Sequence, residues 1–271
     1  MKILNFLSKT TFFKCCFFVC YIIGRAFLKF IIGVGRVSIF SYKTFLSLFH
    51  KRFFLNNLIE SMYTNGFCSI PLIGFTGVFI GAVLTLQLFI SMSGFGLNDN
   101  IPNIVLIALT KEMAPVICCL MVVSRVGSSM SSEIAGMACN NQLDVLMSMS
   151  ISKYRFLYIP RILSMIIFQP ILTTIGVITG MIGCLFITSF FYDYTSLYFF
   201  NLLYENFKIH DYMVGVIKGL VFGFVLSTIA CYKGDKAIDG AVGIKKATIS
   251  SVVSSCIIVL ILNFIITFLF D

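Results

Sequence analysis

The stretch IALTKEMAPVICCLMVV, residues 107–123, places two charged residues in the middle of an apolar run. Lys111 and Glu112 are adjacent, and a proline follows three residues after the glutamate. The apolar segments on either side, residues 101–110 and 113–124, are each too short to cross a bilayer, which takes about 20 residues. Together they are long enough. The stretch therefore predicts a membrane span that is interrupted by charge and by a helix-breaking residue.

The composition of the whole chain is that of a membrane protein. Of its 271 residues, 59% are hydrophobic and 11% are charged, whereas a soluble domain carries about 25% charge. Residues 61–98, 162–192 and 247–270 contain no charge, and residues 212–232 contain only Lys218. Each is long enough to cross a bilayer. With the opening stretch they predict an all-α integral membrane protein with five transmembrane helices.

The basic residues between the spans predict the orientation of the chain. Residues 1–52 contain nine basic residues, residues 125–161 contain four, and residues 233–246 contain four. By contrast, residues 93–103 contain none and residues 193–211 contain one. Cytoplasmic loops of membrane proteins carry an excess of Lys and Arg. Five spans with a cytoplasmic N-terminus place every basic-rich segment inside, so the C-terminus is expected outside.

Near the N-terminus, residues 11–45 are apolar but interrupted by basic residues. At 100° per residue, five of these fall within about 60° of one another. They are Lys14, Arg25, Lys29, Arg36 and Lys43. A basic stripe on an apolar helix is typical of a helix that lies in the membrane plane. A soluble amphipathic helix is the alternative. Because no small-residue cleavage site follows, the segment is expected to be retained rather than removed as a signal peptide.

The sequence offers little support for catalysis, metal binding or nucleic-acid binding. Ten cysteines are present, but no CxxC pair, and only His50 and His210 could assist them, so the cysteines are expected to be small buried hydrophobes. The GxSxG, HExxH and P-loop motifs are absent. If the chain takes part in ATP-driven transport, another subunit supplies the ATPase. The basic residues flank apolar segments, which indicates membrane topology rather than nucleic-acid binding.

Two further patterns concern packing and partners. Glycines at GxxxG spacing let membrane helices approach closely. They are Gly77 and Gly81, Gly176 and Gly180, and Gly215, Gly219 and Gly223. In the inner loop, NNQLDVLMSM (residues 140–149) places Leu143, Leu146 and Met147 on one helical face. This short helix could be a handle for a cytoplasmic partner or a connector that packs on its own bundle, and the pattern leaves both possibilities open.

Two long motifs follow each other in the middle of the chain, LTKEMAPVICCLMVVSRVGSSMSSEIAGM (109–137) and NNQLDVLMSMSISKYRFLYIPRIL (140–163). They resemble the MlaE-type permease family, the membrane subunits of lipid ABC transporters that work with MCE-domain proteins. TGVFIGAVLTLQ (76–87) is similar to the first-span motif of the family, and YKGDKAIDGAVGIKKATISSVV (232–253) to its last inner loop. The likeness covers about residues 60–270.

The resemblance implies a homodimeric permease in the cell inner membrane. An in-plane helix in residues 1–55 would precede a permease domain, residues 56–271, with a cytoplasmic N-terminus and a periplasmic C-terminus. Two cytoplasmic ATPase subunits would bind the ATP, so no cofactor is expected on this chain. Phospholipid would pass to or from an MCE-domain carrier and so maintain outer-membrane lipid asymmetry. The competing hypothesis is a stand-alone channel or ion-coupled transporter that uses Lys111 and Glu112.

The family motifs also imply roles for single residues. The expected lipid-cavity residues are Leu84, Ser91, Met92, Phe95, Lys111 and Glu112. The expected ATPase-coupling residues are Asn141, Gln142, Leu143, Asp144, Leu146 and Met147. Arg125 and Glu133 lie about two helical turns apart and are expected to form a structural ion pair. Lys111 stands where the family usually has arginine, Ala114 where it has glycine, and Asn141 where it has glutamate. Whether Glu112 contacts lipid or only pairs with Lys111 is left open.

Overall fold

The computed structural model describes residues 55–92, 100–191 and 196–270, together with part of the segment 21–47. The chain divides into two compact units, Met1–Leu46 and Ser47–Asp271. In the first unit, residues 35–44 are helical. Lys14 and Lys29 of the expected basic stripe lie outside the described residues. The placement of this segment in the membrane plane therefore stays a prediction.

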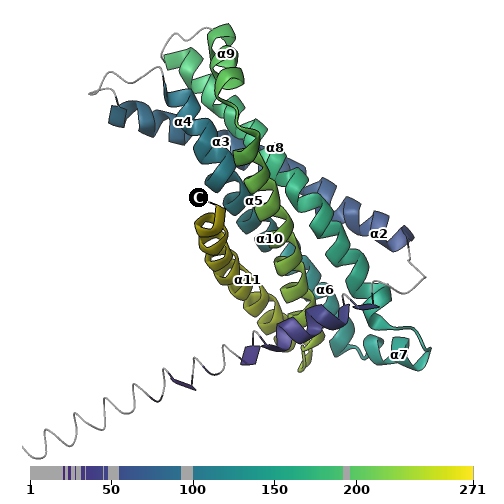
Figure 1. Ribbon diagram of the computed structural model, residues 1–271. Helices are drawn as coiled ribbons and strands as arrows, with labels where there is room; N and C mark the ends of the chain where they lie inside the picture. Colours follow the sequence, from purple (N-terminus) through teal and green to yellow (C-terminus); the bar gives the residue numbers. More distant parts are fainter. Residues whose placement is uncertain are drawn as a thin grey trace, which may run out of the picture. The chain divides into compact units, whose positions relative to one another are not determined.

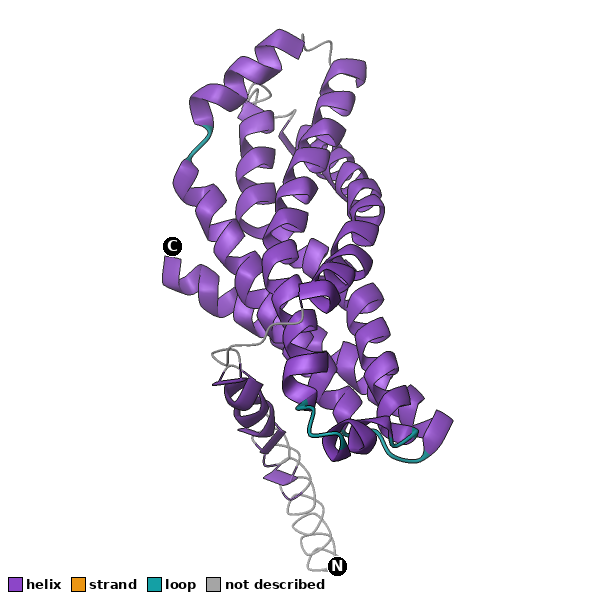
Figure 2. Ribbon diagram, turned by 90° about the vertical axis from the view of Figure 1, so that its right-hand side faces the viewer, coloured by secondary structure: helices purple, strands orange, loops and turns teal. Residues whose placement is uncertain are grey.

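The second unit confirms the expected all-α fold, with five helices long and apolar enough to cross a membrane. These candidate spans are Leu55–Met92, Ile101–Cys139, Tyr154–Phe191, Ile209–Asp235 and Gly240–Phe270. Figure 2 shows that the long helices of this unit run alongside one another and are joined near their ends by short connections. The first span starts closer to the N-terminus than the charge-free run at residues 61–98. Its first helix, Leu55–Ser61, has the polar sequence LNNLIES.

Several spans are assembled from consecutive helical pieces. The first joins α2 (Leu55–Ser61) to α3 (Ile70–Met92). The second comprises α4 (Ile101–Ala108), α5 (Ala114–Val122) and α6 (Ser128–Cys139), with π-helical turns at Leu109–Met113 and Val123–Gly127. The third consists of a π-helical turn at Tyr154–Tyr158 followed by α8 (Ile159–Phe191). The fourth and fifth are α10 (Ile209–Asp235) and α11 (Gly240–Phe270). A helix that mixes α and π turns changes the direction in which its side chains project.

Two short helices occupy opposite ends of this unit (Figure 1). α7 (Gln142–Ser148) connects the second span to the third, and α9 (Ser196–Asn206) connects the third to the fourth. The expected short helix in the inner loop is therefore present as α7. Basic residues lie in and beside the segment after α7 and the α10–α11 connection, and Lys153 of the first contacts Asp235 at the end of α10.

Glycines allow α8 to pack closely against its neighbours α3 and α10. A Cβ on Gly81 would collide with the main chain of Gly180, and a Cβ on Gly223 would lie 2.5 Å from the carbonyl oxygen of Met165. Such contacts need glycine because no side-chain atom fits between the two backbones. The expectation that the GxxxG glycines mark helix contacts is confirmed at these positions.

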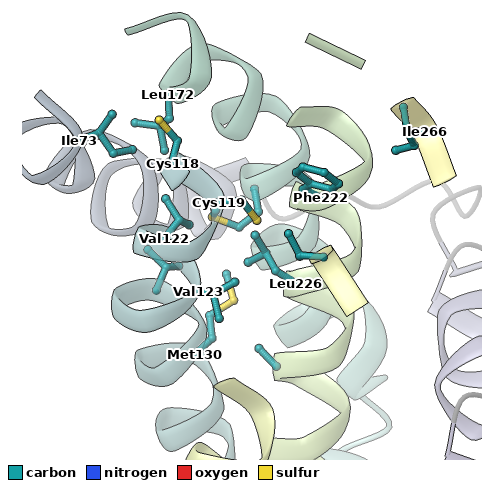
Figure 3. Close-up of a cluster of buried hydrophobic side chains, with 14 residues drawn as sticks. Ile73, Cys118, Cys119, Val122, Val123, Met130, Leu172, Phe222, Leu226 and Ile266 are labelled. Carbon is teal, nitrogen blue, oxygen red and sulfur yellow. The ribbon is translucent and has the colours of Figure 1, made fainter. Parts of the chain in front are cut away.

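Cysteines contribute to the core in the manner expected for small hydrophobes. Cys118 and Cys119 on α5 are buried among side chains of α8, α10 and α11, including Phe222 and Leu226 (Figure 3). Cys184 and Cys231 are also buried, and these four thiols are free. Burial as a free thiol is the ordinary behaviour of this residue in an apolar core.

The fourth span is central in the bundle and the fifth is peripheral. In the most apolar part of each helix, 67% of the residues are buried in α10 but only 17% in α11. Large apolar side chains of α11, among them Val253, Ile257 and Phe264, are exposed. A helix with an exposed apolar face is suited to contact with lipid or with another membrane helix.

Candidate functional site

The candidate site is built around Lys218, which lies on α10 and is fully buried. Its Nζ donates three hydrogen bonds: to the carbonyl oxygen of Lys111 at 2.8 Å, to Oε1 of Glu112 at 2.9 Å, and to Oγ1 of Thr267 at 2.8 Å. A lysine ammonium has three donors, so each is used. A buried ammonium is stable only when its charge is paired and its donors are satisfied, and this arrangement meets both conditions.

The carboxylate of Glu112 is the counter-ion of this lysine. Its Oε1 also accepts a hydrogen bond from Thr267 Oγ1 at 2.8 Å, and its Oε2 accepts one from Asn263 Nδ2 at 3.0 Å. The Glu112 side chain is 36% exposed, whereas Lys218 is not exposed at all. We call Lys111, Glu112, Lys218, Asn263 and Thr267 the Lys218 cluster. It joins the second, fourth and fifth spans and is open to the surroundings on the glutamate side.

A proline explains why a lysine is needed at this place. In an α-helix, the carbonyl of residue 111 would accept a hydrogen bond from the main-chain N–H of residue 115. Pro115 has no N–H, and the segment before it, Leu109–Met113, is π-helical. The Nζ of Lys218 supplies the donor that the proline lacks. A carbonyl inside a membrane must find its donors within the protein, and the ammonium of Lys218 is one such donor.

The side chain of Lys111 points to a different partner. Its Nζ lies 3.6 Å from Oδ1 of Asp211, near the start of α10, and this carboxylate also lies 3.6 Å from Nδ1 of His210. The adjacent residues Lys111 and Glu112 therefore bind different parts of α10. The possibility that Glu112 pairs only with Lys111 is replaced by its pairing with Lys218.

The other expected lipid-cavity residues lie apart from this cluster. Leu84 and Met92 on α3 are half-buried and pack against an apolar cluster of α3, α4, α8 and α9. Ser91 is exposed, and its Oγ donates to the carbonyl oxygen of Gln87 at 2.8 Å. Phe95 lies outside the described residues. The five described cavity residues thus divide into a group on α3, made of Leu84, Ser91 and Met92, and a charged pair in the π-helical turn before α5.

A small pocket lies near the charged pair but is lined by none of the five described cavity residues. It lies between α3, α5 and α8 and is lined by residues that include Thr76, Ile80, Leu109, Met113 and Gly176. Its lining is mainly apolar, and Met113 follows Glu112 directly in the sequence. The pocket has room for about one water molecule, so it marks an apolar surface near Glu112 rather than a preformed cavity for a ligand.

The expected coupling residues form an exposed helix with a single anchor. Leu143 of α7 is buried and Leu146 is half-buried, whereas Met147 is exposed, so only part of the predicted apolar face turns inward. The remaining expected residues, Asn141, Gln142 and Asp144, are exposed. Asn141 adopts a left-handed conformation with a φ of 57°. Asparagine tolerates this conformation better than most residues, which gives a physical reason for its presence at the start of α7.

Arg125 and Glu133 do not form the expected ion pair with each other. Arg125 Nη1 donates to Ser69 Oγ at 2.7 Å, and Glu133 Oε2 lies 3.0 Å from Arg161 Nη2. The prediction assumed two regular α-helical turns between them. The π-helical turn at Val123–Gly127 changes this geometry, because it inserts extra backbone per turn. Each residue instead ties the second span to another span.

Three residues of the Lys218 cluster are absent from the site predicted from the sequence. Lys218 is visible there as a lone charge in an otherwise apolar span, and such charges usually mark functional sites. Asn263 and Thr267 are four residues apart on α11 and therefore share one helical face. Their polar character within a strongly apolar helix is the signal that could have identified them.

Comparison with known proteins identifies the family. The family model for Permease MlaE matches residues 58–269. A probable ABC transporter permease of Rickettsia conorii is 37% identical over 248 residues, 92% of this chain and 96% of the relative. One from Synechocystis sp. is 30% identical over 227 residues, 84% and 86% of the two chains. The intermembrane phospholipid transport system permease protein MlaE of Haemophilus influenzae is 26% identical over 246 residues, 90% and 94% of the two chains. With this match over most of its length, the chain belongs to the MlaE family of ABC transporter permeases.

Proposed function

We propose that this protein is the permease subunit of an ATP-driven transporter that moves phospholipid between the inner membrane and an MCE-domain carrier in the periplasm. Through this transport it maintains the lipid asymmetry of the outer membrane. The observation that carries the proposal is the similarity over 90% of the chain to the Haemophilus protein, whose name states intermembrane phospholipid transport. The protein acts as a homodimer with two ATPase subunits.

The arrangement of charged and apolar residues supports a phospholipid as cargo. A phospholipid needs an apolar surface for its acyl chains and polar groups for its head. The apolar side chains around the small hollow between α3, α5 and α8 supply part of the first. The partly exposed carboxylate of Glu112, held in place by Lys218, supplies a polar group next to it. In this proposal the headgroup lies near Glu112 and the acyl chains lie along α3.

α7 supports the proposed contact with the ATPase. It is anchored to the bundle by Leu143, but Val145 and Met147 are about half exposed. Exposed apolar side chains on a short helix outside the spans are suited to a groove on a partner protein. The proposed orientation, with a cytoplasmic N-terminus and a periplasmic C-terminus, places α7 on the cytoplasmic side, where the ATPase subunits bind ATP.

Co-purification in mild detergent tests the proposal. The wild-type chain is expected to co-purify with an ATPase subunit and an MCE-domain protein. Val145→Asp on α7 is expected to lose the ATPase, because a charge replaces an apolar contact. Val242→Asp is the matched control: Val242 is also exposed, but it lies at the start of α11. If the wild-type chain binds neither partner and alone carries a solute down its gradient in proteoliposomes, the stand-alone transporter is the correct function.

A further inference from the structure

Asp235 is the last residue of α10, a position that disfavours a carboxylate. The C-terminal end of a helix carries partial negative charge, so an acidic side chain there is repelled unless a cation or donor compensates it. Asp235 is also largely buried, with 10% of its side chain exposed. The structure must therefore provide specific partners for this carboxylate.

Both partners come from the segment that follows α7. Lys153 Nζ lies 2.7 Å from Oδ1 of Asp235, and Tyr158 Oη donates to the same oxygen at 2.6 Å. Tyr158 is fully buried. The two residues flank the first turn of the third span, so the carboxylate holds that turn against the end of α10.

The connection between α7 and Lys153 is short and internally bonded. α7 ends at Ser148, and the N–H of Ile151 donates to the carbonyl oxygen of Leu146 at 3.0 Å. The next hydrogen bond, from the N–H of Arg155 to the carbonyl oxygen of Ser152 at 3.1 Å, begins the following turn. A displacement of α7 therefore has only a few residues in which to be absorbed before it reaches Lys153.

α10 extends from this contact to the Lys218 cluster. Lys218 lies about 25 Å from Asp235 along the helix, at a rise of 1.5 Å per residue. Close packing holds the intervening helix: a Cβ on Gly223 would meet Met165, and a Cβ on Gly234 would lie 2.9 Å from the carbonyl oxygen of Ser131. A helix held in this way moves as a unit rather than bending locally.

We propose that Lys153, Asp235 and Tyr158 form a joint that transmits the displacement of α7 to α10 and so to Glu112 and Lys218. This inference rests on the proposed function, in which an ATPase moves α7. Asp235 is a positioning residue, since it acts through the helix that carries Lys218. When the joint is intact, a shift of α7 changes the position of Lys218 relative to Glu112 and opens or closes the exposed side of the cluster.

The test uses the assembled complex of permease, ATPase and MCE-domain protein in proteoliposomes. ATP hydrolysis and lipid transfer are measured together, and their ratio is the readout. Lys153→Met and Asp235→Asn are each expected to retain hydrolysis but to move about tenfold less lipid per ATP, within the range of coupling energies measured for such networks. Lys233→Met is the matched control, because the Nζ of Lys233 donates to Ser250 on α11 at 2.9 Å and not to the third span. It is expected to keep the wild-type ratio.

A charge exchange distinguishes transmission from simple anchoring. Lys153→Asp combined with Asp235→Lys restores an ion pair and places a cation at the helix end, where it is favoured. The exchange is expected to recover the lipid-to-ATP ratio. If the single variants keep the wild-type ratio, or lose hydrolysis and transfer in equal proportion, the joint is refuted.

Two further outcomes complete the test. If a single variant fails to assemble, the double variant with exchanged charges is the deciding measurement. The joint is also refuted if this double variant assembles but keeps a low lipid-to-ATP ratio. Failure of the wild-type complex to transfer lipid with ATP rejects the proposed function instead. The two ideas therefore fail in different measurements, one on the wild-type complex and one on the variants of the joint.

Discussion

Lys218 on α10 donates a hydrogen bond of 2.8 Å to the carbonyl oxygen of Lys111, which lies four residues before Pro115, a residue with no main-chain N–H. The charged pair and the proline in the second span are therefore parts of one arrangement that a distant lysine completes. The same ammonium neutralises Glu112. An interruption that looks unfavourable in a membrane helix is stabilised by the neighbouring helix.

Lys218→Met should destabilise the protein by about 2 to 3 kcal/mol. The change removes the ammonium that donates to the carbonyl of Lys111 and leaves Glu112 without its counter-ion, and a lost hydrogen bond to a charged group costs about this much. The partial exposure of Glu112 limits the cost. Unfolding of the purified protein in detergent, followed by circular dichroism, measures the difference.

Lys208→Met is the control for this experiment. Lys208 is exposed and precedes the first residue of α10, so the same substitution removes a charge without creating a buried defect. Its unfolding midpoint should match that of the wild type, because surface substitutions usually change stability by less than about 0.5 kcal/mol. Equal stability of Lys218→Met and Lys208→Met would contradict the role assigned to the buried lysine.

Pro115→Ala should reduce the loss of stability that Lys218→Met causes. Alanine restores a main-chain N–H at residue 115, which can donate to the carbonyl of Lys111 in place of the ammonium. Lys218→Met is then expected to cost about 1 kcal/mol less in the Pro115→Ala background than in the wild type, the size of one hydrogen bond. A double-mutant cycle in the same unfolding assay gives this difference. Strict additivity of the two substitutions would show that the proline and the lysine act independently.

Glu112→Lys should weaken both folding and the proposed lipid transport. It places a second ammonium where a carboxylate now lies 2.9 Å from Lys218 Nζ. Two like charges at such a short distance inside a membrane are strongly disfavoured. The combination with Lys218→Glu restores opposite charges and should recover most of the stability. Dimer assembly is expected to persist, which gel filtration can check.

Lipid transfer by the exchanged protein gives information that stability does not. If Glu112 serves only to hold the helices together, the exchanged pair should transport as well as it folds. If the carboxylate faces the cargo, transfer should remain low although stability returns. Normal transfer by Glu112→Lys alone would remove any role for Glu112 in the cavity.

Five spans and the short helix after the second could be predicted because hydrophobic length and local periodicity are visible along a single chain. The partner of Glu112 could not, because it depends on how closely α10 approaches the second span. Gly215 sets that approach: a Cβ there would collide with the carbonyl oxygen of Thr110. The separate partners of Arg125 and Glu133 could not be predicted for a similar reason, since a π-helical turn has no clear sequence signature.

Two glycines of α3 give a matched test of the helix contact on which the bundle depends. A Cβ on Gly81 would collide with the main chain of Gly180 on α8, whereas a Cβ on Gly74 would meet nothing within 4 Å. Gly81→Ala should therefore destabilise the protein by about 1 to 3 kcal/mol, the usual cost of overpacking. Gly74→Ala should be neutral or slightly stabilising, because alanine is the better helix former. The difference between their unfolding midpoints in detergent isolates the packing effect, since both variants make the same substitution in the same helix. If Gly81→Ala is as stable as Gly74→Ala, α3 and α8 are not held by this close backbone contact.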